Sequence, residues 1–297
     1  MAAMLDYLQF VLAPQVVNGL AIGVAVVLVA LGLTIIFGLL DVINMSHGEF
    51  YAVGAYLALS LGVAGVNFWL LLVLVPALMV PIGFAVERGL IQRVFNTPER
   101  HVTTLLLTFG LGLVIEEVLK LVYGPNTQRP PNPIPGAVEF LGIFLPNYRL
   151  FLIVFGLLIV AVVALVVFRT RLGAMVRAAA FDRNMAASLG VPVARVYAGA
   201  FAFGVALAGI AGVLLAPIYS VFPTMGRDFI LMAFTVVIVG GMGSIAGAVV
   251  AGLLLTQVQA IASLYISPVW TDPIVFGIMV LVLMVRPQGL FGRIGRA

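Results

Sequence analysis

The sequence predicts an all-α polytopic membrane protein with eight or nine transmembrane helices, some of them short or broken. Three observations support this fold class. First, 63% of the 297 residues are hydrophobic and only 9% are charged, whereas soluble domains carry about 25% charged residues. Second, a soluble protein of this length could not bury so much apolar surface. Third, the apolar residues form continuous runs instead of alternating with polar ones, which favours helices over a membrane-spanning barrel.

Nine apolar runs are the candidate membrane-crossing helices, and we expect them to form one transmembrane domain over residues 1–297. They cover residues 16–39, 47–63, 67–87, 101–123, 148–168, 196–219, 229–242, 245–264 and 272–286. A helix needs about 20 mainly apolar residues to cross a hydrocarbon layer of ~30 Å. The second, seventh and ninth runs are shorter than this, so the corresponding helices are expected to be short.

Glycines interrupt the long apolar run from residue 229 to residue 264. Gly240, Gly241 and Gly243 weaken helix continuity there, so eight spans fit the sequence as well as nine. Because broken helices in membranes usually line a path, these glycines are a candidate hinge. Small residues spaced by four elsewhere predict only close helix packing. Those pairs are Gly19–Gly23, Gly204–Ala208, Ala208–Gly212 and Gly243–Gly247.

The distribution of basic residues predicts the orientation of the chain. Placing residues 169–195 in the cytosol leaves four basic residues outside: Lys120, Arg129, Arg149 and Arg227. The other eleven lie inside: Arg88, Arg93, Arg100, Arg169, Arg171, Arg177, Arg183, Arg195, Arg286, Arg293 and Arg296. Since cytoplasmic loops carry an excess of Lys and Arg, nine spans put the N-terminus outside and the C-terminus inside.

The longest outside loop, residues 124–147, holds six of the sixteen prolines. Proline fixes φ and removes a backbone donor, so we expect a stiff extended strap instead of a helix. The strap is either a plain connector or part of a docking surface for an external partner.

The sequence lacks the residues that most catalytic chemistry requires. Lys120 is the only lysine and is not preceded by glycine, so no Walker A motif is present. The two histidines, His47 and His101, form no HExxH motif, and there is no cysteine. We therefore expect a protein that is not an enzyme and that has neither a cofactor nor a metal site. The net charge of +4 reflects arginines in cytosolic loops and does not indicate nucleic-acid binding.

Residues 41–56, DVINMSHGEFYAVGAY, form the chemically richest part of the apolar region. In a helix, Asn44, His47 and Tyr51 fall on one face, and Glu49 points elsewhere. Ionisable groups at membrane depth indicate either a pathway or a paired structural site. These four residues are the candidate substrate path. The alternative is that they cap or bridge helices at the cytosolic mouth of the first hairpin.

Glu116, Glu117 and Lys120 lie toward the outer end of the fourth apolar run. Glu116 and Lys120 have the favourable i, i+4 order for a helical ion pair. A local salt bridge near the membrane interface accounts for these residues.

The polar segment 169–195 interrupts the apolar runs. Phe181, Met185 and Leu189 recur every four residues, which predicts one short amphipathic helix with an apolar stripe, ended by Gly190. Its polar surround consists of Arg177, Asp182, Arg183 and Asn184. Such a helix either lies in the lipid headgroup layer or docks into a groove on a partner.

Four motifs identify a family resemblance over nearly the whole chain. They are GLTIIFGLLDVINMSHGEFYAVGAY (32–56), RAAAFDRNMAASLGV (177–191), GGMGSIAGAVVAG (240–252) and RPQGLFG (286–292). With these motifs in this order, the chain resembles the membrane permease subunits of bacterial branched-chain amino acid ABC importers. Its length is similar to that of the shorter of the two permeases in such systems.

The resemblance implies a permease in the inner membrane that works by alternating access. Its implied partners are a second homologous permease, two cytosolic ATPase subunits and an extracytoplasmic solute-binding protein. The residues that would couple to the ATPases are Arg177, Phe181, Asp182, Met185, Leu189 and Gly190. The resemblance assigns no individual roles to Asn44, His47 and Glu49.

Three other functions remain open from the sequence. A related permease could carry urea, short amides or another small solute. A self-sufficient secondary transporter or channel would need coupling-ion sites, and the sparse acidic residues in the spans argue against it. A membrane scaffold would give no reason for the polar segment 41–56.

Overall fold

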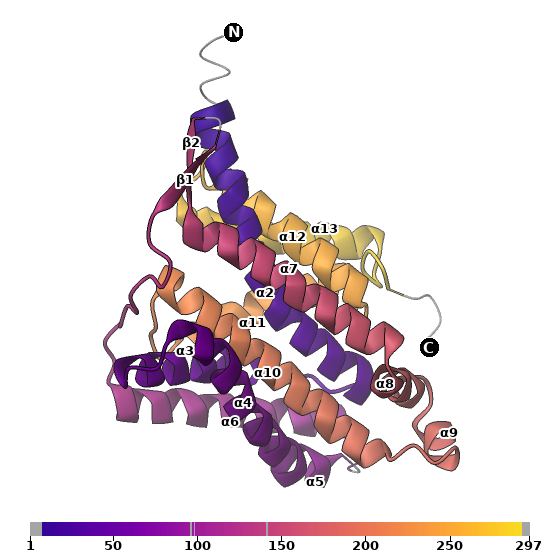
Figure 1. Cartoon of the computed structure of the whole chain (residues 1–297). Helices are drawn as coiled ribbons and strands as arrows, with labels where there is room; N and C mark the ends of the chain where they lie inside the picture. Colours follow the sequence, from indigo (N-terminus) through magenta and orange to yellow (C-terminus); the bar gives the residue numbers. More distant parts are fainter. Residues whose placement is uncertain (1–7, 96, 98, 141, 293–297) are drawn as a thin grey trace.

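We describe the protein from a computed structural model (Figure 1) over residues 8–95, 97, 99–140 and 142–292. The α-helices in this part of the chain are α2 (Ala13–Leu40), α3 (His47–Val63), α4 (Phe68–Val86), α5 (Gln92–Val94), α6 (Arg100–Tyr123), α7 (Asn147–Arg169), α8 (Arg171–Phe181), α9 (Arg183–Ser188), α10 (Val193–Tyr219), α11 (Met225–Gly240), α12 (Ile245–Ala262) and α13 (Thr271–Val285). Two π segments and one 3-10 segment add η1 (Leu8–Leu12), η2 (Glu87–Ile91) and η3 (Pro268–Trp270). The predicted inside residues Arg293 and Arg296, and both chain ends, lie outside the described residues.

Each of the nine predicted apolar runs overlaps one long helix of the described chain. Five helical stretches are long and apolar enough to cross a membrane, and α13 is a shorter apolar helix. The five are Phe10–Leu40, Phe68–Val94, Asn147–Arg169, Val193–Tyr219 and Ile245–Ala262. The predicted class, a polytopic helical membrane protein, is confirmed.

Helices α2 and α10 form the centre of the bundle (Figure 1). In the most apolar 18 residues of the stretch that contains α2, 83% are buried, and in those of α10, 78% are buried. The corresponding shares are 28% for Phe68–Val94, which contains α4, and 22% for α7. Helices α3 and α4 pack against α10, and α12 packs against α2. The peripheral helices leave apolar side chains exposed, as expected where lipid is the solvent.

Small residues let these central helices approach closely. A Cβ on Gly204 of α10 would lie 2.8 Å from the backbone oxygen of Gly32 on α2. A Cβ on Gly54 of α3 would lie 2.5 Å from the Cα of Gly209 on α10. The predicted packing role of the small residues on α10 is therefore confirmed, since larger side chains would push the helices apart.

The glycines at 240–243 separate α11 from α12. The chain turns there with Gly241 at φ 100°, a conformation that glycine adopts without strain. Leu290 N donates to the carbonyl of Val239 (2.8 Å), and Phe291 N donates to that of Gly240 (3.0 Å). The motif at 286–292 thus satisfies the last carbonyls of α11, which have no partner inside the helix.

The outer loop contains an element that the sequence did not predict. Strands β1 (Ala137–Phe140) and β2 (Ile143–Pro146) pair antiparallel, with Ala137 opposite Pro146 and Phe140 opposite Ile143. The proline-rich part before them is not helical, as predicted. Gln128 makes an isolated bridge to Val221, with Gln128 N donating to the Val221 carbonyl at 2.8 Å.

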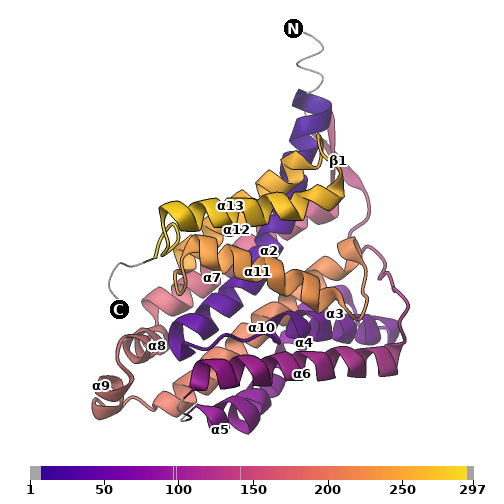
Figure 2. The ribbon, with the colours of Figure 1, turned by 180° about the vertical axis from the view of Figure 1, so that it is seen from behind.

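The segments predicted to lie on opposite sides of the membrane lie at opposite ends of the molecule. Figure 2 shows α8 and α9 at the lower left and β1 at the upper right, with α6, α11 and α13 running across between them. This arrangement fits the predicted orientation, in which α8 and α9 belong to the cytosolic side.

Candidate functional site

The polar segment forms two short helices, so the predicted single amphipathic helix is wrong. Helix α8 ends at Phe181 and α9 begins at Arg183, because Asp182 takes an extended conformation (φ −148°, ψ 112°). Its Oδ1 accepts hydrogen bonds from Asn184 N (2.8 Å) and Met185 N (2.9 Å). Aspartate is among the preferred N-cap residues, and here it starts a new helix inside the predicted one.

Gly190 ends α9 as predicted. It has φ 83°, its N–H donates to the Ala187 carbonyl, and Val191 N donates to the Ala186 carbonyl, both at 3.0 Å. This pair of bonds is a Schellman motif, which needs the left-handed residue that glycine supplies.

The three predicted apolar residues remain on the surface, although they belong to two helices and a cap. Phe181 is 79% exposed, Met185 59% and Leu189 78%. On the same short helix, Ala186 is buried, so α9 packs through its small residue and leaves the larger ones outward. Three exposed apolar side chains on a segment outside the bundle are suited to a partner surface or to lipid.

Two arginines attach this segment to the bundle. Arg177 donates from Nη1 to the carbonyl of Val167 on α7. The guanidinium of Arg183 lies 4.6 Å from the ring centre of Phe95 and 5.7 Å from that of Tyr197 on α10, a cation–π arrangement. These contacts connect α8 to α7 and α9 to α10. These two aromatic partners could not be predicted from the sequence.

Residues 41–46 form a non-helical connection that runs along α6. Asp41 Oδ2 lies 3.0 Å from Arg100 Nη2, at the start of α6. Further along, Met45 N donates to Thr108 Oγ1 at 3.0 Å. Helix α3 therefore begins beside the middle of α6 and not beside its first turn.

The four candidate path residues are all buried, but they do not share one helix face. Asn44 precedes α3, where its Oδ1 accepts from Ser46 N (3.1 Å) and Ser46 Oγ (2.7 Å). The predicted helical face with Asn44 is therefore wrong, since the chain before His47 is not helical. His47 Nε2 lies 3.1 Å from the Val29 carbonyl on α2. The ring centre of Tyr51 lies 4.2 Å from that of Phe229 on α11.

Glu49 points toward α11 and α6, away from His47 as predicted. A Cβ on Gly226, in the first turn of α11, would lie 2.5 Å from Glu49 Oε2. A Cβ on Gly112 of α6 would lie 3.6 Å from Glu49 Cγ. Glu49 is only 5% exposed, and Oε2 has no hydrogen-bond partner among the described residues.

A second buried carboxylate, Glu116, is held by two cations. Lys120 Nζ lies 2.7 Å from Glu116 Oε1 and 2.8 Å from Glu117 Oε1, which confirms the predicted local salt bridge. Arg227 Nη2 lies 2.6 Å from Glu116 Oε2. This ion pair joins α6 to α11. Its two residues are 111 positions apart, so no local spacing in the sequence predicts it.

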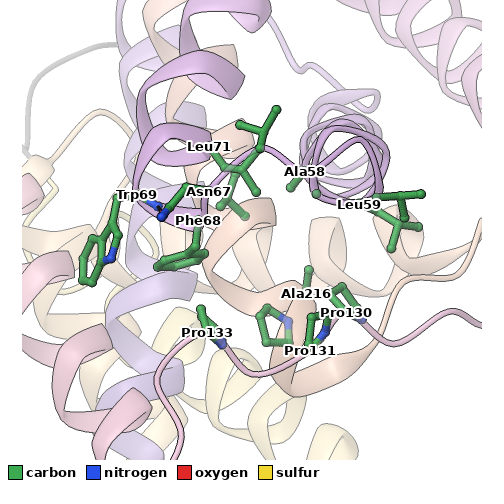
Figure 3. A pocket seen from close by; sticks show the side chains of 15 residues that line it. Ala58, Leu59, Asn67, Phe68, Trp69, Leu71, Pro130, Pro131, Pro133 and Ala216 are labelled. Carbon is green, nitrogen blue, oxygen red and sulfur yellow. Dashed lines mark hydrogen bonds between the residues drawn. The ribbon is translucent and has the colours of Figure 1, made fainter.

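The proline strap also contributes to an apolar pocket at the end of the molecule that carries the outer loop (Figure 3). The pocket has a volume of about 600 Å³ and lies between the ends of α3, α4 and α10. Pro130, Pro131 and Pro133 line one side, opposite Phe68 and Trp69. The strap thus forms one wall of this pocket.

Comparison with known proteins relates the whole chain to one family. Residues 15–284 match the family described as branched-chain amino acid transport system / permease component. The chain is 31% identical to the high-affinity branched-chain amino acid transport system permease protein LivH of Salmonella typhimurium, over 94% of this chain and 95% of the relative. It is also 31% identical to BraD of Pseudomonas aeruginosa over the same shares. LivM of Escherichia coli, another permease of such a system, is 27% identical over 89% of this chain and 67% of the relative. No solved structure matches.

Proposed function

The chain belongs to the family of branched-chain amino acid transport permeases, and on this premise we propose that it is the pore-forming subunit of an ABC importer. It moves branched-chain or related amino acids across the inner membrane by alternating access, driven by partner ATPases. The observation that carries this proposal is the 31% identity to two such permeases over 94% of the chain. The helical fold with several membrane-crossing stretches supports it.

The chain acts as a transport subunit and not as an enzyme. Its relatives are named as permeases, and its lone lysine, Lys120, belongs to no nucleotide-binding motif. The energy for active transport therefore comes from other chains.

The proposed membrane arrangement has nine spans in one permease domain, with the N-terminus outside and the C-terminus inside. The separation of α8 and α9 from the outer hairpin supports this orientation. The short helices α3, α11 and α13 count as spans in this arrangement.

The proposed partners are a second homologous permease, two cytosolic ATPases and an extracytoplasmic solute-binding protein. Similarity to both LivH and LivM relatives supports the pairing of two homologous permeases. The pocket beneath the proline strap (Figure 3) lies on the side that the binding protein would approach.

The ATPases dock on α8 and α9. Phe181, Met185 and Leu189 supply the apolar contact, and their exposure fits a groove on a partner. Asp182 and Gly190 fix the ends of α9, while Arg177 ties α8 to α7.

The substrate path passes the region of Asn44, His47, Glu49 and Tyr51. These side chains are buried in this conformation, so the path opens only when neighbouring helices separate. The turn at Gly240, Gly241 and Gly243 is the proposed hinge for that movement.

Uptake of radiolabelled leucine by cells tests this function. Cells that lack the gene should take up leucine slowly, and the intact gene should restore uptake. Labelled urea and acetamide, measured alongside, distinguish the alternative small solutes. Restored uptake of either of these, with none for leucine, isoleucine or valine, would contradict the proposal.

A further inference from the structure

Helices α3 and α11 begin beside each other inside the bundle. The chain before α3 runs along α6. On this path Asp41 lies beside Arg100 of α6, Met45 beside Thr108, and Ser46 beside Gly112. Gly112 lies about 18 Å from Arg100 at 1.5 Å per residue, near the middle of α6, which is one of the nine proposed spans. Non-helical backbone at such depth is tolerated where it is buried in protein or lines a cavity. Helix ends at this depth form the substrate sites of many transporters.

The two buried carboxylates near the starts of α3 and α11, Glu116 and Glu49, differ in their partners. Glu116 is bound by both Lys120 and Arg227. Glu49, equally buried, has no ion pair with any described residue, and its Oε2 accepts no hydrogen bond from them. A buried carboxylate without a partner costs free energy, so Glu49 is suited to accept a cationic group from a ligand.

The first turn of α11 lies next to this carboxylate and carries the cation Arg227, followed by the acidic residue Asp228. Gly226 has no side chain, and any Cβ there would overlap the Glu49 carboxylate. The next residue, Arg227, keeps 58% of its side chain exposed although it is paired with Glu116. The dipole of α11 also favours an anion at its first turn, although Met225 N and Arg227 N already donate to Phe222 and Thr224. Glu49, which can accept a cation, thus lies beside Gly226, the residue before Arg227, which can bind an anion.

We propose that Glu49 binds the α-ammonium group of the amino acid in transit, while Arg227 and the start of α11 bind its carboxylate. This proposal rests on the proposed transport function and assigns that function a recognition site inside the permease. In the present conformation the site is closed, because Glu49 is buried between α3, α6 and α11. Alternating access opens it by separating these helices.

The absence of cysteine from the chain makes a direct test possible. Ser46 lies at the start of α3, within reach of Gly112, so Ser46→Cys places a single thiol of this subunit beside the site. A cationic methanethiosulfonate reagent labels the purified complex with its ATPases and second permease, and the mass of this subunit gives the labelling rate. We expect saturating leucine to slow the labelling.

Adding Glu49→Gln to Ser46→Cys should raise the leucine concentration for half-maximal protection roughly tenfold or more, because a charge-assisted hydrogen bond is lost. Glu117→Gln is the matched control, since Glu117 is an exposed carboxylate on α6, and it should leave the protection intact. Equal protection with and without the Glu49 carboxylate would overturn the proposal.

A second arm leaves Glu49 unchanged and therefore does not depend on how the variant folds. In the Ser46→Cys complex, leucine amide keeps the ammonium group and should still slow labelling. The acid 4-methylpentanoate lacks that group and should not. Protection by 4-methylpentanoate equal to that by leucine would contradict the role of Glu49. If the wild-type complex takes up no leucine, the transport function itself fails, and this result is separate from the labelling.

Discussion

At the scale of single residues, Asp182 in the motif at 177–191 has a structural role, because it starts α9. Its carboxylate caps α9, and loss of such a cap costs about 1 kcal/mol of helix stability. Asp182→Ala should therefore lower leucine uptake, whereas Asp182→Asn, which retains the capping oxygen, should keep most of it. Equal loss in both variants, measured at equal membrane abundance, would mean that the partner requires the negative charge itself.

A second residue-scale prediction compares two glycines in helices. Replacing a helical glycine with alanine normally stabilises a helix by roughly 0.5–1 kcal/mol. Gly110→Ala should do so, because nothing lies within 4 Å of the added Cβ. Gly32→Ala should destabilise instead, since its Cβ would lie 2.6 Å from the Gly204 carbonyl oxygen. The unfolding temperatures of the purified variants test this, and a gain for Gly32→Ala would contradict the packing described for α2 and α10.

At the scale of elements, the exposed apolar residues of α8 and α9 decide whether this segment binds protein or lipid. Phe181→Asp combined with Met185→Asp should abolish copurification of the ATPases and leucine uptake, because a docking groove would reject two buried charges. Phe144→Asp, an exposed apolar position on β2 in the outer hairpin, is the control and should leave assembly intact. Intact assembly and transport in the double variant would exclude docking at this surface.

Most elements could be predicted from the sequence, and the exceptions have identifiable causes. Continuous apolar runs locate the long helices, because backbone groups in lipid must form their hydrogen bonds within a helix or a closed barrel. The break at Asp182 was missed because the spacing of Phe181, Met185 and Leu189 fits one helix as well as two. The ion pair between Glu116 and Arg227 was missed because it depends on how α6 and α11 pack.

At the scale of the whole molecule, the predicted orientation in the membrane rests on the excess of basic residues on one side. Asn126→Cys in the outer loop should react with a membrane-impermeant thiol reagent added to intact cells. Asn184→Cys on α9 should react only after the membrane is opened. The reverse pattern would overturn the topology, and the cysteine-free chain keeps the background low for this subunit.

Reconstitution tests the central claim most directly. Proteoliposomes that contain this chain, its second permease and both ATPases should accumulate leucine only when ATP and the solute-binding protein are supplied. This chain alone, given a proton or sodium gradient, should accumulate none. Ion-driven leucine uptake by the chain alone would contradict its assignment as the permease subunit of an ABC importer.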